Sequence, residues 1–156
     1  MPWRLNLLIA ASSLTELFRK GIGVVVEADF VRKIFAGLEH GDGAAFFEHV
    51  ADDVDWTVMG THPLAGHYKS KADFTAATFA KLGKVLPGGA QLHVDDLFIA
   101  GDVAIVELDS KDIAKNGLRF ATHYCWVCYF KNNKIIRVRA YLDSAMVARL
   151  FAENPV

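Results

Sequence analysis

The segment 118–143 constrains the fold more than any other part of the chain, because it predicts two long adjacent strands. The strands extend over Leu118–Lys131 and Lys134–Leu142, and only Asn132 and Asn133 lie between them. Asparagine adopts positive φ angles at little cost, so a two-residue Asn-Asn connection closes a hairpin with the twist that its strands require. A chain with this hairpin is expected to form a sizeable antiparallel sheet.

Both faces of the first of these strands are largely apolar. Because side chains alternate along a strand, one face carries Thr122, Tyr124, Trp126, Cys128 and Phe130. The other face carries His123, Cys125, Val127 and Tyr129. A strand that is apolar on both sides is covered on both sides. We therefore expect the aromatic face to enclose a pocket.

Length and charge exclude several classes of partner. The chain has 156 residues, the length of one domain with a substantial core. Its formal net charge is -1, and its Lys and Arg residues are scattered along the sequence. No apolar run is long enough for a membrane-spanning helix. We expect neither nucleic acid nor a membrane as a partner.

We divide the sequence into an N-terminal extension, residues 1–26, and a domain, residues 27–156. The stretch MPWRLNLLIAASSL faintly resembles a secretion signal, but it is short and no clear small-residue cleavage site follows it. We expect the extension to be helical instead, with a helix over Ser13–Lys20.

The two cysteines, Cys125 and Cys128, form a CxxC pattern. On a strand, residues three apart point to opposite faces, so these thiols cannot share a metal ion or a disulfide. A chain without a disulfide framework is typical of a reducing compartment. We therefore expect a cytoplasmic protein.

Hydrophobic periodicity predicts the remaining elements. The helical period predicts three helices before the hairpin: Glu27–His40, Gly43–Val50 and Ser70 to about Leu82. Alternation predicts three further strands: Val54–Met59 (after a turn at 51–53), Ala90–Ile99 and Val103–Asp109. Asp143 stands where it can cap a last helix, Ser144–Ala152. This order of elements indicates an α+β fold.

The phrases ADDVDW, PLAGHY and KIIRVRAYLDSAMVARL, in this order of elements, resemble the nuclear-transport-factor-2-like superfamily, and within it the SnoaL-like and ketosteroid-isomerase-like branch. The resemblance extends over about Ala28–Phe151. It implies a strongly bent antiparallel sheet that forms a conical barrel around a cavity, with three packed helices. It also implies a homodimer through the outer face of the sheet. The same scaffold serves isomerases, cyclases, hydrolases and non-catalytic binders, so it does not imply one activity.

The residues at the family's catalytic positions depart from the family patterns. The resemblance to ketosteroid isomerases places two acids near Val58 and Trp126, and neither acid is present. SnoaL-like cyclases and limonene-epoxide hydrolases carry an acid where this chain has Ala140. The strand VAIVELDSK resembles the epoxide-hydrolase segment that bears an Arg and an Asp, and it carries Glu107 and Asp109. The position that carries an acid in these cyclases and hydrolases is therefore occupied here by Ala140, which has no acidic group.

Glu107 and Asp109 are nevertheless the leading catalytic candidates. They lie two residues apart on one predicted strand, so their carboxylates face the same way. If that face lines the pocket, the two charges repel each other and the pair can serve as acid and base. Otherwise the carboxylates are solvated, or they pair with Arg137 or Arg139.

Tyr124 and His62 complete the set of catalytic candidates. Tyr124 supplies a hydroxyl on the aromatic face, and His62 lies in a loop at the expected rim of the pocket, where an imidazole can shuttle a proton. The residues predicted to bind the ligand are Trp56, Val58, Trp126 and Ala140. The histidines show no spacing that gives three metal ligands, so we expect no metal ion and no cofactor.

Two functions remain open from the sequence. The first is a cofactor-independent general acid/base enzyme, of the isomerase, cyclase or hydrolase type, acting on a small hydrophobic or polycyclic molecule. The second is a non-catalytic protein that binds a small hydrophobic ligand. Ala140 favours the second function, whereas Glu107 with Asp109 favours the first.

Overall fold

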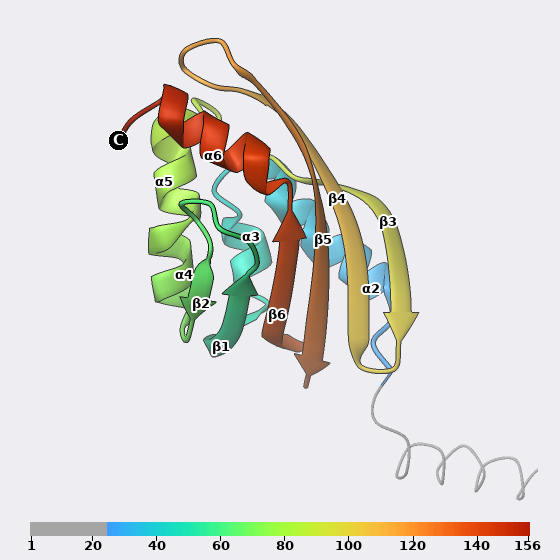
Figure 1. Ribbon diagram of the computed structural model, residues 1–156. Coiled ribbons are helices and arrows are strands. Elements are labelled where there is room, and N and C mark those ends of the chain that lie inside the picture. The colour runs from blue at the N-terminus through green and yellow to red at the C-terminus, as the bar shows by residue number, and fades with distance from the viewer. Residues whose placement is uncertain (1–24) are drawn as a thin grey trace, which may run out of the picture.

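The structure, a computed structural model, describes residues 25–156 (Figure 1). Within this range one sheet carries helices on its inner face, which gives the α+β class predicted from the sequence. The predictions for residues 1–24, among them the helix over Ser13–Lys20, lie outside the described residues.

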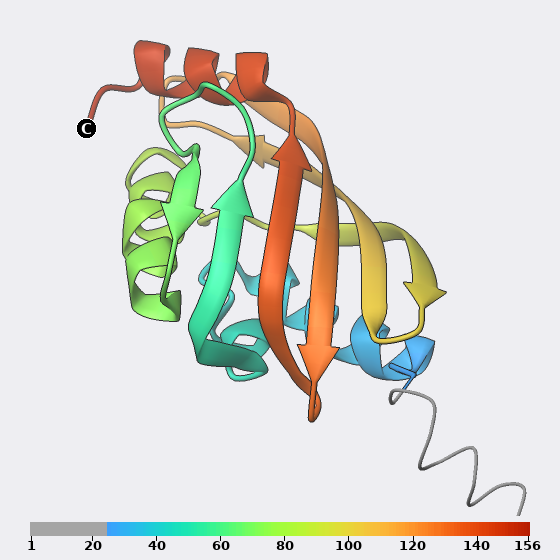
Figure 2. The ribbon, with the colours of Figure 1, turned by 60° about the horizontal axis from the view of Figure 1, so that its bottom comes forward.

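Six strands form the sheet: β1 (Val50–Val58), β2 (Gly66–Tyr68), β3 (His93–Ala100), β4 (Val103–Ile113), β5 (Arg119–Lys131) and β6 (Lys134–Leu142). Their order is β2-β1-β6-β5-β4-β3. Neighbours pair antiparallel except β1 and β6, which are parallel. The sheet is strongly curved but not closed, and it forms a cone-like arrangement rather than a complete barrel (Figure 2).

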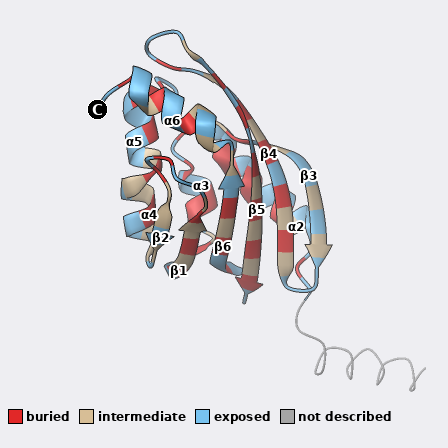
Figure 3. Cartoon of the chain, viewed as in Figure 1, coloured by how far each residue is buried: buried red, intermediate tan, exposed pale blue. Residues whose placement is uncertain are grey.

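The β5–β6 hairpin has the predicted turn. Asn132 and Asn133 both have positive φ angles, 50° and 59°, and Lys131 pairs with Lys134 across them. The predicted faces of β5 are confirmed as well, because the aromatic face is buried along its whole length (Figure 3). The opposite face of β5 is exposed or half-buried.

Helices cover the inner face of the sheet, and the last of them crosses one end of it (Figure 2). They are α2 (Ala28–Phe35), the 3-10 helix η1 (Ala36–His40), α3 (Ala44–Phe47), α4 (Lys71–Ala77), α5 (Phe79–Val85) and α6 (Ser144–Glu153). The predicted helix Glu27–His40 therefore tightens to 3-10 geometry halfway. At Gly37 it touches α3 so closely that a Cβ atom would lie 2.5 Å from the backbone nitrogen of Phe46.

Three local features differ from what the sequence predicts. The predicted turn at 51–53 lies inside β1, whose pairing with β6 is irregular between Val50 and Asp55. The short strand β2 was not predicted, because three residues carry too little pattern. The predicted helix from Ser70 is two helices, since Thr78 has φ -122° and ψ -78° and its hydroxyl donates to the carbonyl of Phe74 at 2.7 Å.

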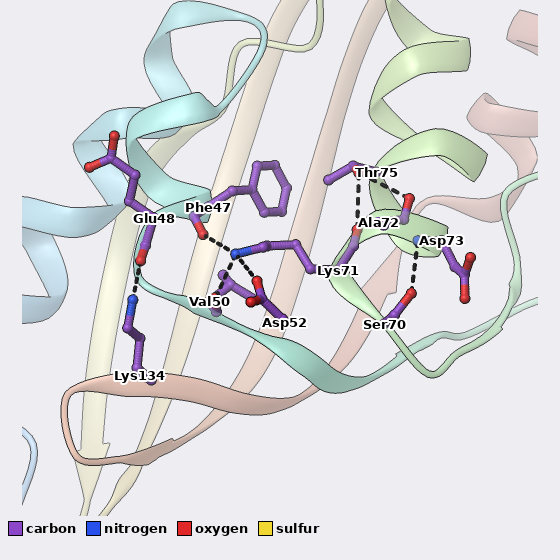
Figure 4. A network of polar contacts seen from close by, with 10 residues as sticks. All are labelled: Phe47, Glu48, Val50, Asp52, Ser70, Lys71, Ala72, Asp73, Thr75 and Lys134. Atoms are coloured by element: carbon purple, nitrogen blue, oxygen red, sulfur yellow. Dashed lines mark hydrogen bonds and ion pairs between the residues drawn. The ribbon is translucent and has the colours of Figure 1, made fainter.

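Lys71 ties the beginning of β1 to the helices on either side of it (Figure 4). Its ammonium group donates to the carbonyl oxygens of Phe47, at 3.3 Å, and Val50, at 3.0 Å. It also forms an ion pair of 2.7 Å with Asp52. The hydrogen bond from Lys71 holds the pKa of Asp52 below its usual value. One side chain thus satisfies two carbonyls between α3 and β1 and fixes the start of α4 beside them.

The N-cap of α6 provides a direct test of the fold. Asp143 Oδ1 accepts a hydrogen bond of 3.0 Å from the backbone N–H of Met146, as the sequence predicts for a capping residue. Asp143→Ala is expected to lower the free energy of unfolding by about 1 kcal/mol in urea titrations. Asp143→Asn keeps an equally good cap and is the matched control. Equal stability of the two variants would contradict the capping role.

Candidate functional site

An apolar cavity lies between the inner face of the sheet and the helices α4, α5 and α6. Five of the eight residues predicted for the site line it: Trp56, Val58, Tyr124, Trp126 and Ala140. They come from three neighbouring strands, β1, β5 and β6, whose pairing places Val58 beside Ala140 and Ala140 beside Trp126. The pairing of these strands therefore assembles residues that are far apart in the sequence.

Aromatic contacts hold the two tryptophans of the cavity in place. The Trp56 ring stacks on Phe74, with ring centres 3.9 Å apart and planes 17° apart. The Trp126 ring meets Trp56 edge to face at 5.2 Å and 84°. Both indole nitrogens are buried, and neither has a hydrogen-bond partner among the described residues. Two of the residues that line the cavity thus carry a buried indole N–H without a partner among the described residues.

The cavity is small in this state. The volume that the centres of water molecules can occupy is about 40 Å³, room for about three water molecules. Pockets that hold a drug-sized ligand usually measure ~300–1,000 Å³. The walls must therefore move before a polycyclic molecule can be bound.

Tyr124 is the tyrosine among the described residues that line the cavity. Burial raises its pKa far above the usual value, and a hydrogen bond with Ser110 offsets only part of this effect. The hydroxyl is therefore neutral at physiological pH. A neutral phenol in an apolar cavity can donate a hydrogen bond but is a poor base.

The structure places Glu107 and Asp109 on the outer face of the sheet. The pairing of β4 with β5 sets this, because Leu108 lies opposite Tyr124 and is buried, while Glu107 lies opposite Cys125. The Asp109 carboxylate pairs with Lys111 Nζ at 3.2 Å, a partner that the sequence analysis did not consider. The two carboxylates do face the same way, but not into the cavity.

His62 is buried beside the cavity's rim and does not line the cavity. Its Nδ1 accepts a hydrogen bond of 3.2 Å from the N–H of Leu64, so its Nε2 carries the proton and donates to the carbonyl of Met59 at 3.0 Å. Both ring nitrogens therefore hold the loop between β1 and β2. Of the four catalytic candidates, Glu107 and Tyr124 both line one surface pocket, and Asp109 and His62 do not line it.

Phe79 is a cavity residue that was not among the site residues predicted from the sequence. It begins α5 directly after the break at Thr78, and it lines both the inner cavity and a surface groove formed with Asp42, Thr75, Ala76 and Ala80. The Phe79 ring thus stands between the cavity and the outside. Its role depends on the interruption between α4 and α5, and the sequence pattern, which reads as one helix, does not show that interruption.

Other chemistries find little support in the described part of the chain. No group of three or more His, Cys, Asp or Glu side chains there could hold a metal ion. Burial raises the pKa of both Cys125 and Cys128, which keeps these thiols protonated and weakly nucleophilic. Within residues 25–156 no helix has both the length and the apolar character needed to cross a membrane.

Comparisons with known proteins agree on the fold. A curated protein named dimerizing cyclase phiC, from Fungal sp. (strain ATCC 74256), is 28% identical over 138 residues, covering 84% of this chain and 59% of that protein. This chain thus spans only about three-fifths of that relative's length. An NTF2-like protein from Burkholderia thailandensis E264 matches with a TM-score of 0.68 at 26% identity, over 79% of this chain and 95% of that one.

A further solved structure, TerC co-crystallised with polyporic acid, matches with a TM-score of 0.66 at 20% identity, over 80% of this chain and 96% of that one. At this identity the likeness shows the fold alone. The model of the SnoaL-like domain family matches residues 31–138, which is most of the chain. The chain therefore belongs to the SnoaL-like domain family, within the NTF2-like superfamily.

Proposed function

We propose that the protein binds a small, uncharged, apolar molecule in the cavity beneath α4, α5 and α6. The composition of the cavity wall carries this proposal. Among the described residues that line it, none carries a charged side chain, and only Thr78, Tyr124, Trp56 and Trp126 carry any polar side-chain atom. A charged ligand would lose its hydration there without gaining a charged partner from the described residues.

Access to the cavity runs past Phe79 in this proposal. The helix break at Thr78 leaves α5 joined to α4 by a non-helical residue, so α5 can tilt without unwinding either helix. A tilt that withdraws the Phe79 ring joins the cavity to the surface groove and supplies the missing volume. The small resting cavity is then the closed form of a larger pocket.

A cyclase-type reaction is the second candidate, favoured by the name of the fungal relative and by the state of Tyr124. A closed apolar cavity can hold a flexible substrate in the bent shape that ring closure requires. The neutral Tyr124 hydroxyl can then donate a hydrogen bond to an oxygen that gains charge during the reaction. Glu107 and Asp109 take no part in this scheme, because they lie on the outer face.

A homodimer through the outer sheet face is proposed as the assembly. This face exposes Phe98 (52% exposed) and Tyr141 (44% exposed). It also carries Arg139, which donates to the Tyr129 hydroxyl at 2.7 Å and forms no ion pair with any described residue. Glu107 lies two strands away on the same face. A two-fold axis near β5 would place Glu107 of each copy against Arg139 of the other.

Two substitutions on the cavity wall test the binding proposal, one that makes a side chain larger and one that makes a side chain smaller. Ala140→Val is expected to weaken binding of indane, a small hydrocarbon, by about tenfold, because the added methyl groups take up space that the ligand needs. Val58→Ala is expected to strengthen it. Ile113→Ala, at an exposed position, is the control. Titration by tryptophan fluorescence measures the affinities, and thermal unfolding verifies each fold. Unchanged affinity in both cavity variants would reject the proposed site.

Phe79→Ala tests the access route. Removing the ring is expected to raise both the association and the dissociation rate of indane in stopped-flow fluorescence, because both depend on the same opening. The matched control is Leu82→Ala, since Leu82 lines the cavity but not the surface groove. Rates that increase equally in the two variants would show that cavity size, and not the Phe79 ring, limits access.

A charge exchange tests the dimer. Arg139→Glu and Glu107→Arg, made singly, are each expected to shift the protein toward the monomer in sedimentation velocity, because like charges then meet across the interface. The double variant restores opposite charges and is expected to restore the dimer. A native protein that sediments as a monomer at all concentrations, or a double variant no better than the singles, would contradict this arrangement.

A further inference from the structure

A surface pocket on the outer side of the sheet, here called the outer pocket, gathers two acidic side chains. Asp95 of β3 and Glu107 of β4 both line it, and both are exposed. Neither carboxylate forms an ion pair with a described residue. The pocket measures about 380 Å³, on the measure that gives about 40 Å³ for the inner cavity. The outer face therefore offers an open site with uncompensated negative charge.

His123 of β5 also lines the outer pocket. Histidine is the type of side chain that ordinarily changes charge between pH 5 and 8. The thiol of Cys125, in the same pocket, stays protonated, because burial and then the negative charge of Glu107 raise its pKa. Protonation of His123 therefore adds a positive charge beside carboxylates that remain ionised. The charged or titratable side chains on the elements beside His123 are His93 and Asp95 on β3, Glu107, Asp109 and its partner Lys111 on β4, Cys125 on β5, Tyr141 on β6 and Asp143 after β6.

Two arginines of β6 carry the complementary charge. The guanidinium carbons of Arg137 and Arg139 lie 5.1 Å and 5.6 Å from the centre of the Tyr129 ring. Arg139 also donates to the Tyr129 hydroxyl at 2.7 Å. Neither arginine forms an ion pair with a described residue. Tyr129 thus holds both cations in place before any partner arrives, which lowers the entropy cost of binding one.

Strand β5 separates the acidic side of the outer face from the basic side. In the sheet, β4 and β3 lie to one side of β5 and β6 lies to the other. A two-fold axis that crosses β5 exchanges the two sides, so the acids of each copy meet the arginines of the other. A second copy of this chain is therefore the occupant that the charge pattern favours for the outer pocket.

We infer that the outer pocket receives Arg139 of a second copy, and that protonation of His123 expels this arginine, so that the dimer dissociates as the pH falls below neutral. This inference rests on the proposed homodimer and adds a means of regulating it. The proton on His123 and the incoming guanidinium group compete for the same two carboxylates, those of Asp95 and Glu107.

The sign of the pH dependence follows from this competition. In the monomer, Asp95 and Glu107 stabilise a protonated His123. In the dimer the arginine neutralises these carboxylates and repels the protonated imidazole. The dimer therefore binds fewer protons than two monomers do, and by linkage a fall in pH favours the monomer. Two-fold symmetry gives two outer pockets, so up to about two protons are taken up when one dimer dissociates.

Sedimentation velocity of the native chain tests the inference. Concentration series at about pH 7.5 and about pH 5.5, at one ionic strength, bracket the range in which histidine titrates. We expect the dissociation constant of the dimer to rise by about 10- to 100-fold at the lower pH, because up to about two protons are linked to dissociation.

Three variants assign the response to His123. His123→Gln cannot gain the charge and is expected to stay dimeric at both pH values. His123→Arg carries a permanent charge and is expected to be monomeric at both. The matched control is His93→Gln, since His93 is exposed and lies opposite Asp109 but does not line the outer pocket. This control is expected to respond to pH as the native chain does. Thermal unfolding at both pH values verifies each fold.

The possible outcomes separate this inference from the proposed homodimer. A native dimer with equal dissociation constants at both pH values would overturn the inference and leave the homodimer standing. A native chain that is monomeric at both pH values would overturn both and leave the pocket to another occupant, such as a small organic cation. A pH response that persists in His123→Gln, or that disappears in His93→Gln, would assign the response to another group and overturn the inference.

A measurement on the native chain decides the question should the His123 variants fail to fold. Dilution calorimetry near pH 6, in two buffers with different ionisation enthalpies, counts the protons exchanged when the dimer dissociates. We expect an uptake of about one to two protons per dimer. Dissociation without proton uptake would overturn the inference.

Discussion

The register between β4, β5 and β6 is the constraint on which the remaining structure depends. Each strand presents alternate residues to opposite faces, so a shift of one position would exchange the apolar face and the polar face of the whole strand. The turn at Asn132 and Asn133, with both residues at positive φ, pairs Lys131 with Lys134, and an irregularity between Tyr129 and Phe130 then shifts the register of β5 with β6 by one residue. The aromatic face of β5 is buried as a result, and the helices pack on it.

The same sheet separates the uncharged side chains of the cavity from charged side chains on its outer face. The inner face holds a cavity lined by uncharged side chains, and the outer face holds Glu107, Asp109 and Arg139. A strand backbone lies between the two sets, so an outer carboxylate cannot take a proton from a ligand on the inner side. This arrangement favours recognition by shape and hydrogen bonding over acid/base catalysis by paired carboxylates. It also leaves the outer charges available for contact with another copy of the chain.

The cavity combines a rigid wall with a wall that can move. The strands β1, β5 and β6 hold Trp56 and Trp126 through continuous pairing and stacked aromatic rings. On the other side, α4 and α5 meet at the non-helical residue Thr78. In the proposed access route, a displacement of α5 would leave these strands and their aromatic rings in place. Such a division suits a site whose resting volume is much smaller than its ligand.

The sequence by itself determined the elements with strong local patterns: the hairpin, the burial of the aromatic face of β5, the cap at Asp143, and the family. It also pointed to Trp56, Val58, Trp126 and Ala140, which line the cavity in the structure, because these positions follow from alternation and from the family pattern. Only the tertiary structure decided where Glu107 and Asp109 point, since that depends on how β4 pairs with β5. The break at Thr78, the position of Phe79 and the engagement of both nitrogens of His62 were likewise decided there. They arise from contacts between elements distant in sequence, or from backbone angles that periodicity does not encode.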